Sequence, residues 1–85
     1  MEKATSGKET VNLGLAIHIE RLRGNLSQAE LASRVGISQS MLSLIERGEP
    51  PSLKTLAKIA EALNTPLSRL IASAEKESEI RRTKG

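Results

Sequence analysis

Residues that stop helices recur at short intervals along this 85-residue chain. Glycine and asparagine end helices by adopting left-handed backbone conformations, and proline cannot continue a helix. Most stops are followed within a few residues by a helix-starting signal, either a capping side chain or a proline in the first turn. These signals confine the chain to short helices with tight turns. The stops are Gly24-Asn25, Gly36, Gly48 with Pro50-Pro51, and Asn64-Thr65-Pro66, and the predicted N-caps are Asn12, Ser27, Ser38 and Ser52.

Apolar residues recur at helical spacing between these stops, which predicts about five helices beginning near residues 12, 27, 38, 52 and 66. In the first helix, Leu15, Ile19 and Leu22 form one apolar face, and we expect this face to be buried. Leu13 and Ile17 form a second apolar set on another side of the helix. No alternating β-branched run or Asn-Gly turn indicates a strand. The predicted fold class is therefore all-α, a compact bundle of short helices.

The chain divides into three parts by composition. Residues 1–11 are polar and are predicted to form a disordered N-terminal arm. Residues 12–72 carry the helical pattern and form a single domain. Residues 73–85 are predicted to form a charged tail, which either extends the last helix from Ala72 or frays.

The composition excludes several classes of function. With no cysteine and one histidine, the chain offers no thiolate metal site and no nucleophilic triad, so we predict a non-enzyme without cofactors. No Gly-rich phosphate loop and no small-molecule site is evident. The absence of aromatic residues excludes base stacking on single strands. No apolar run is long enough for a membrane span, and a cytoplasmic location fits the lack of cysteine. The net charge of +3 favours an anionic partner only weakly.

The segment from Gln28 to Ile45 meets the requirements of a helix-turn-helix. A tight crossing needs a small side chain where the helices approach each other and a residue that tolerates positive φ in the turn. Ala32 meets the first requirement and Gly36 the second. The apolar contacts between the two helices are expected from Leu31, Val35, Ile37, Leu42 and Ile45.

These motifs resemble those of the XRE family of bacterial and phage regulators, which includes the Cro and cI repressors. The resemblance covers roughly residues 13–71. It implies a lambda-repressor-like DNA-binding domain whose recognition helix, about residues 38–46, enters the major groove. The motifs that carry it are S-Q-x-x-L-A, the G-I-S turn, I-E-R-G, and P-S-x-x-T-L-x-x-I-A-x-A-L.

The resemblance also implies which residues contact the bases. Gln28 would contact the DNA backbone and brace a base-contacting side chain, while Gln39 and Ser40 would contact base edges. Glutamine can bind adenine with two hydrogen bonds, which supports this role on chemical grounds. Ser43 is expected to lie close to the DNA. Leu44 occupies a further base-contacting position, and because it is apolar we predict a thymine methyl opposite it.

Another group of residues is predicted to contact phosphates. Ser27 and Ser38 cap helices, and the free N–H groups at helix N-termini suit phosphate binding. The resemblance adds Arg47, which precedes the closing glycine, and both Ser52 and Lys54 at the start of the next helix. Solvated surface residues would show the same pattern, so the alternative at these positions is an ordinary exposed face.

Three other positions carry structural expectations. The resemblance implies that Glu46 pairs with a basic residue at the end of the first helix, which is Arg23 in one register and Arg21 in the other. His18 is expected at the surface or partly buried without a functional role. Met41 is expected in the core or at its edge.

The leading interpretation is a sequence-specific transcriptional regulator of double-stranded DNA, most simply a repressor, which binds a palindromic operator as a homodimer. Leu67, Leu70 and Ile71 are the first candidates for the dimer interface, and Leu13 with Ile17 are the second. All of these could instead complete the core. Alternative functions are an antitoxin or restriction–modification controller with the same fold, or a helical protein-interaction module of the transcription machinery.

Overall fold

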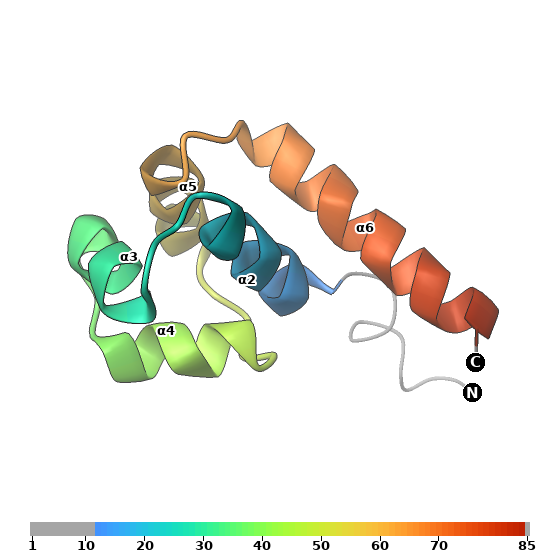
Figure 1. The fold of residues 1–85 in the computed structure, drawn as a ribbon, viewed down its shortest axis with the longest axis horizontal. Coiled ribbons are helices and arrows are strands. Elements are labelled where there is room, and N and C mark those ends of the chain that lie inside the picture. The colour runs from blue at the N-terminus through green and yellow to red at the C-terminus, as the bar shows by residue number, and fades with distance from the viewer. Residues whose placement is uncertain (1–11, 85) are drawn as a thin grey trace.

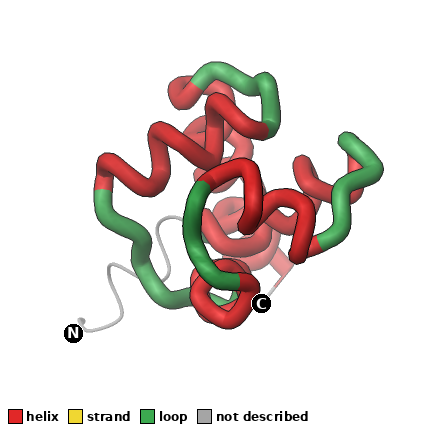
Figure 2. Tube along the Cα trace, turned by 90° about the vertical axis from the view of Figure 1, so that its left-hand side faces the viewer, coloured by secondary structure: helices red, strands yellow, loops and turns green. Residues whose placement is uncertain are grey.

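The computed structural model describes the backbone of residues 12–84 and the side chains of residues 12–76. The predicted N-terminal arm, residues 1–11, therefore lies outside the described residues. The described chain is built from helices joined by short loops and contains no strand, which confirms the all-α prediction (Figures 1 and 2). None of its helices combines the length and apolar character needed to cross a bilayer. The helices are α2 (Leu13–Arg23), α3 (Gln28–Val35), α4 (Gln39–Glu46), α5 (Leu53–Ala62) and α6 (Leu67–Lys84).

The predicted capping residues begin four of these helices. The side-chain oxygens of Asn12, Ser27, Ser38 and Ser52 each accept a hydrogen bond from the backbone N–H three residues later, at 3.0–3.3 Å. Ser27 also donates its backbone N–H to the Glu30 carboxylate at 2.7 Å, which completes the capping box. These bonds satisfy donors that an α-helix leaves unpaired at its start, so local sequence defines where each helix begins.

The predicted helix stops adopt the left-handed conformation at the positions that need it. Gly36 ends α3 at φ +89°, and Gly48 after α4 has φ +126°. Asn25 and Asn64 have φ +57° in the loops after α2 and α5. Asparagine tolerates this region better than most residues that have a side chain, which explains its use at these two ends.

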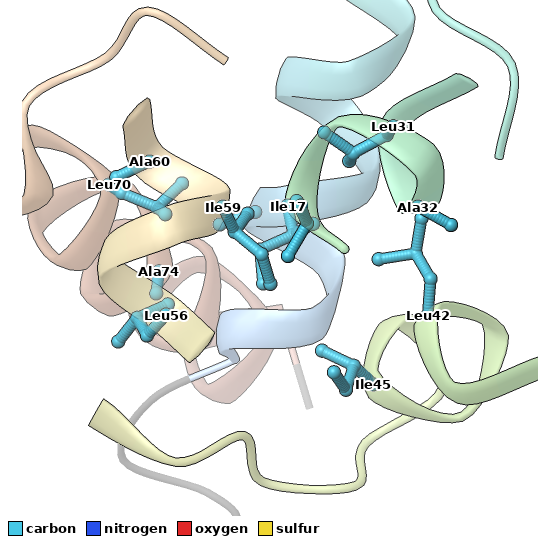
Figure 3. Packing of buried hydrophobic residues seen from close by; sticks show 12 residues of the cluster. Ile17, Leu31, Ala32, Leu42, Ile45, Leu56, Ile59, Ala60, Leu70 and Ala74 are labelled. Atoms are coloured by element: carbon cyan, nitrogen blue, oxygen red, sulfur yellow. The ribbon is translucent and has the colours of Figure 1, made fainter. Parts of the chain in front are cut away.

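The hydrophobic core draws on every described helix (Figure 3). Its largest fully buried side chains are all aliphatic, so packing depends on branched residues that interlock without an aromatic ring. Helix α6 packs along α2, α4 packs against both α2 and α3, and α5 packs against α3 and α6 (Figure 1). The fully buried large residues are Ile17, Leu31, Leu42, Ile45, Ile59 and Leu70.

Helix α2 buries a different face from the one predicted. Gly14, Ile17 and Arg21 are buried, whereas Leu22 is 54% exposed and its two predicted partners are only half-buried. The prediction was wrong because α2 carries two apolar stripes, and periodicity cannot choose between them. Contacts with α4 decide which face of α2 is buried, because they require Gly14 and Arg21 on the side of α2 that faces α4.

The last helix extends beyond the predicted domain boundary at residue 72. Helix α6 continues to Lys84, and Ala74 is fully buried in the core. The backbone N–H of Asn12 donates to the Ala74 carbonyl at 3.3 Å, which joins the start of α2 to the middle of α6. Leu70 is also fully buried, so it belongs to the core and not to a dimer surface. The same correction applies to Ile17, a member of the second candidate set.

Candidate nucleic-acid interface

Helices α3 and α4 form a helix-turn-helix with a three-residue turn, Gly36-Ile37-Ser38. The backbone N–H groups of Gly36 and Ile37 both donate to the Ala32 carbonyl, at 2.8 and 3.0 Å. Ala32 is buried where the two helices approach, as its small side chain predicts. The turn fixes the direction in which α4 leaves α3, and α4 forms one edge of the molecule (Figure 1).

Helix α4 separates cleanly into an inner and an outer face. Leu42 and Ile45 are buried in the core. The outer face presents Gln39 and Ser40 in the first turn, with Ser43 half-buried behind them. The predicted base-contacting residues therefore share an accessible side of one helix.

Leu44 belongs to this outer face and is 45% exposed. It also lines an open groove between the start of α2 and the segment that follows α4, together with Arg47, Pro50 and Pro51. A leucine left half exposed beside two prolines is not accounted for by the core of its own domain.

The end of α4 packs directly against the backbone at Gly14 of α2. A Cβ atom at this position would lie 2.5 Å from the Ile45 carbonyl oxygen and 2.7 Å from that of Glu46. Real Cβ contacts are never that short, and the opposing atoms are backbone atoms that cannot rotate away. Glycine is therefore required for α2 and α4 to approach each other. The sequence does not reveal this role of Gly14, because a glycine near a helix start gives no local signal of close packing.

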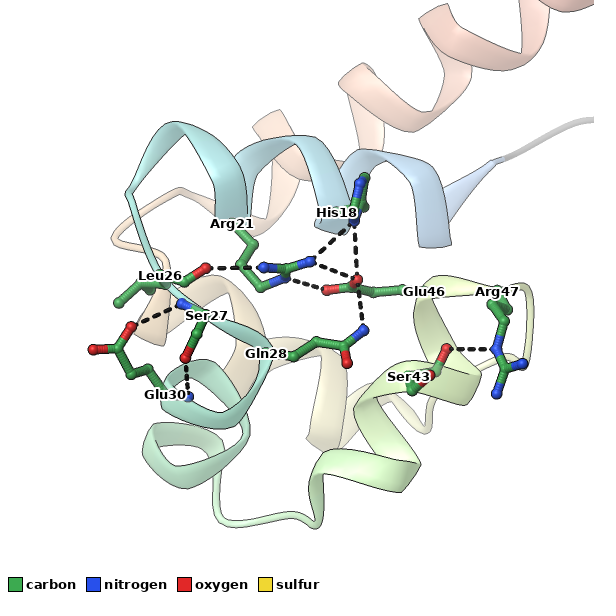
Figure 4. A network of polar contacts seen from close by, with 9 residues as sticks. All are labelled: His18, Arg21, Leu26, Ser27, Gln28, Glu30, Ser43, Glu46 and Arg47. Atoms are coloured by element: carbon green, nitrogen blue, oxygen red, sulfur yellow. Dashed lines mark hydrogen bonds and ion pairs between the residues drawn. The ribbon is translucent and has the colours of Figure 1, made fainter.

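A buried ion pair ties the end of α4 to α2 (Figure 4). The Arg21 guanidinium donates from Nε to Glu46 Oε2 at 2.7 Å and from Nη2 to Oε1 at 3.2 Å. Its Nη1 donates to the Leu26 carbonyl at 2.9 Å, so the same side chain also holds the loop before α3. The Glu46 side chain is only 5% exposed.

The pairing of Glu46 with Arg23 is wrong, and Arg21, the other predicted partner, is the observed one. Arg23 instead forms an exposed pair with Glu20 at 3.2 Å. Two residues along an α-helix correspond to a rotation of about 200°, so only one of the two arginines can face α4. Arg21 lies seven residues after Gly14, on the same face of α2.

Two further side chains converge on the Glu46 carboxylate. Gln28 donates its amide Nε2 to Oε1 at 3.2 Å, and His18 Nδ1 lies 3.0 Å from the same oxygen. His18, expected to have no particular role, therefore belongs to this network. Burial alone would raise the pKa of the Glu46 carboxyl, but hydrogen bonds from Arg21, His18 and Gln28 hold the pKa below its ordinary value. The carboxylate thus stays ionised and connects α2, α3 and α4.

The predicted phosphate-contacting residues lie at helix ends around α4. The hydroxyl oxygens of Ser27, Ser38 and Ser52 each accept a capping hydrogen bond, and all three residues are exposed. Arg47 is the C-cap residue of α4, and its guanidinium bonds only weakly to the Ser43 carbonyl, at 3.4 Å. Lys54 is exposed in the first turn of α5. These five residues are exposed, and none of them belongs to the hydrophobic core, so an anion could reach them.

Met41 differs from its prediction as a core or core-edge residue. It is 44% exposed, on the side of α4 that also presents Leu44. The prediction placed Met41 inward because apolar residues of this segment separate from the polar ones onto one side of a helix. Spacing alone does not decide its position, because Met41 lies four residues before the buried Ile45 and three before the exposed Leu44.

The family model described as "Helix-turn-helix" matches residues 17–70, which span α3, α4 and α5 completely. The chain belongs to this helix-turn-helix family. As a member, it is a domain of the kind that binds DNA in transcriptional regulators, in agreement with the XRE-type motifs of the sequence.

Three proteins illustrate the family likeness. The chain is 42% identical over 59 residues to the ImmF control region 10 kDa protein of Bacillus phage phi105, a match that covers 68% of this chain and 66% of the phage protein, just under two thirds. The clp gene regulator ClgR from Corynebacterium glutamicum has a similar structure, with a TM-score of 0.85 and 25% identity over 89% of this chain and 82% of ClgR. The biofilm master regulator SinR, solved in complex with DNA, has a TM-score of 0.64 and 33% identity over 68% of this chain and 95% of SinR.

Proposed function

We propose that this helix-turn-helix protein is a sequence-specific repressor that binds a palindromic operator as a homodimer, with α4 in the major groove. The proposal rests on one observation above all: the outer face of α4 carries small hydrogen-bonding and apolar side chains that its own fold does not use. A recognition helix needs such side chains in its first turn, where they reach base edges. Gln39 and Ser40 occupy that turn and are exposed.

The surroundings of α4 support the proposed binding mode. The exposed N-termini of α3 and α5, capped by Ser27 and Ser52, offer backbone N–H groups to phosphates. Arg47 and Lys54 add positive charge near these ends. Gln28 uses one amide N–H to bond Glu46, and a glutamine amide has a second N–H that can donate to a phosphate. Phosphate contacts of this kind fix the register of the protein, while the base contacts specify the sequence.

The homodimer is proposed because a single recognition helix contacts too few base pairs for useful specificity. Helices α2 and α6 pack along each other, and each leaves one large apolar residue exposed, Leu22 at 54% and Ile71 at 36%. Of the three residues first predicted for the interface, Ile71 is the most accessible, and Leu67 is half-buried against the core. We therefore propose that the dimer contact includes the exposed side chain of Ile71 on α6. In sedimentation velocity, Ile71→Asp should shift the protein towards monomer, whereas Ala57→Asp on the exposed side of α5 should not.

The central experiment is selection of bound sequences from random duplex DNA with the purified chain. A repressor of the proposed kind enriches one site with two-fold symmetry and half-sites about 34 Å apart. Enrichment of an asymmetric site would contradict the dimer, and the absence of any enriched sequence would contradict sequence-specific binding.

Salt titration separates this proposal from a helical module that binds only proteins. DNA affinity carried by phosphate contacts should fall steeply, by orders of magnitude, between roughly 50 and 200 mM salt. A protein-interaction module would show no such affinity at any salt concentration. The proposed function involves no chemical step and no cofactor, and it places the protein in the cytoplasm with its DNA.

A further inference from the structure

Helix α4 exposes two large apolar side chains on its outer side, Met41 and Leu44. They are 44% and 45% exposed, while the other large apolar residues of the same helix, Leu42 and Ile45, are almost completely buried. The core of the domain therefore leaves two apolar side chains on the one helix that is proposed to enter the major groove. This pair continues the surface formed by Gln39 and Ser40.

The spacing of the pair suits two neighbouring base pairs. Residues three apart on an α-helix lie on one side, separated by about 60° around the axis and about 4.5 Å along it. Consecutive base pairs are about 3.4 Å apart along the DNA axis. Gln39 lies on the opposite flank of the outer face, so hydrogen-bonding and apolar contacts would fall on different base pairs.

The major groove offers one apolar group for such side chains, the methyl on C5 of thymine. Neither leucine nor methionine can satisfy the strong donors and acceptors on the other base edges, so contact with those edges would remove polar groups from water without a partner. We propose that Met41 and Leu44 bind the C5-methyl groups of two adjacent pyrimidines in each half-site. This inference rests on the proposed placement of α4 in the major groove.

A consequence concerns methylated DNA. 5-Methylcytosine carries the same C5-methyl group at the same place in the groove as thymine does. At the two pyrimidine positions, methylation of cytosine should therefore restore part of the affinity that is lost when thymine is replaced by cytosine. The pair would make operator affinity sensitive to the methylation state of cytosine at these positions.

The test begins with the site obtained by selection, in which each thymine is replaced in turn by deoxyuridine. This replacement removes only the methyl group. Burial of one methyl corresponds to about a fourfold change in affinity. We expect about fourfold weaker binding at two adjacent positions, measured by fluorescence anisotropy. The penalty at one of the positions should vanish in Leu44→Ala and at the other in Met41→Ala. Replacing cytosine by 5-methylcytosine at these positions should strengthen wild-type binding by a similar factor.

A matched control is Leu53→Ala, which removes an exposed apolar side chain from α5, outside both α4 and the proposed dimer contact. It should leave both deoxyuridine penalties unchanged, and circular dichroism should show that all three variants are folded. The inference is overturned if deoxyuridine is tolerated at every position, or if the penalties persist unchanged in both α4 variants, because the methyl groups would then act through DNA shape. It is also overturned if the α4 variants lose self-association instead of methyl discrimination. In each of these cases a selected operator would still support the proposed function, whereas failure of selection itself would reject that function.

Discussion

The two faces of α4 are held in very different ways. The inner face is fixed by the core, by backbone contact at Gly14 and by the ion pair between Arg21 and Glu46. The outer face has no comparable restraint: Met41 and Leu44 are exposed, and Arg47 bonds only to the backbone of its own helix. Both faces belong to a helix of eight residues.

Because of this difference, we expect the inner face of α4 to determine the stability of the fold and the outer face to determine DNA recognition. Substitutions on the inner face remove packing or leave a buried charge without its partner, so they should act on the free energy of unfolding. Substitutions on the outer face change side chains that make few contacts, so they should act on DNA binding while the fold persists.

The largest effect is expected from Glu46→Ala. It leaves the Arg21 guanidinium buried without a counter-charge, and breaking a buried pair by removing one partner typically costs about 3–5 kcal/mol. Urea denaturation should show this loss in the free energy of unfolding. Arg23→Ala serves as the control, because its exposed pair with Glu20 contributes little. Equal stability of the two variants would show that the network does not hold α4.

Gly14→Ala is expected to have the next largest effect. The added methyl meets two backbone carbonyl oxygens, so α2 and α4 must move apart, and overpacking of this kind costs about 1–3 kcal/mol. Thermal or urea unfolding measures the change. Gly24→Ala is the matched control, because a Cβ there lies 3.6 Å from its nearest neighbour. If both alanines left stability unchanged, the close approach at Gly14 would be refuted.

On the outer face, Gln39→Ala should weaken binding to the selected operator. A bidentate base contact discriminates by about 1–3 kcal/mol, which corresponds to about a 5- to 150-fold loss of specific affinity. Binding to unrelated DNA and the free energy of unfolding should stay close to those of the wild type, because the side chain is exposed. Unchanged protection of the operator in a footprint would contradict the assignment of α4 as the recognition helix.

The smallest effect concerns acid. Because the pKa of Glu46 is lowered in the folded protein, its contribution to stability is complete above the ordinary glutamate pKa, about 4.3, and is lost as the pH falls through the folded value. Glu30, whose pKa is lowered by hydrogen bonds from Ser27, acts in the same direction. In urea titrations at a series of pH values, Glu46→Gln should show a shallower fall in stability below about pH 4.3 than wild type. An identical slope would mean that Glu46 does not couple protonation to folding.

Local features of the fold followed from the sequence, and contacts between distant residues did not. Ser27, Ser38 and Ser52 marked helix starts because a cap bonds to a backbone group three residues away. The helix-turn-helix was predictable for a related reason, since Ala32 and Gly36 lie within one short segment. The motifs also indicated the outward positions of α4, although the DNA contacts themselves stay predictions.

The errors concentrate in α2, whose orientation depends on a partner 25 residues away in the sequence. Apolar periodicity favoured a face containing Leu22, but the buried face carries Gly14 and Arg21. A charged residue is normally assigned outward, and only its pairing with Glu46 makes burial acceptable. The prediction for Met41 was wrong for the opposite reason: an apolar side chain was expected to be buried, and it is exposed.

Polar contacts fix helix α4 at both of its ends: the Ser38 hydroxyl caps its start, and the ion pair of Glu46 with Arg21 holds its last turn. The exposed positions lie between these two residues and contribute almost nothing to either attachment. The side chains at these exposed positions can therefore be replaced as a group in protein engineering. A set of outer-face side chains transplanted from another helix-turn-helix protein should transfer its operator preference, while the serine cap and the glutamate anchor keep the host fold unchanged.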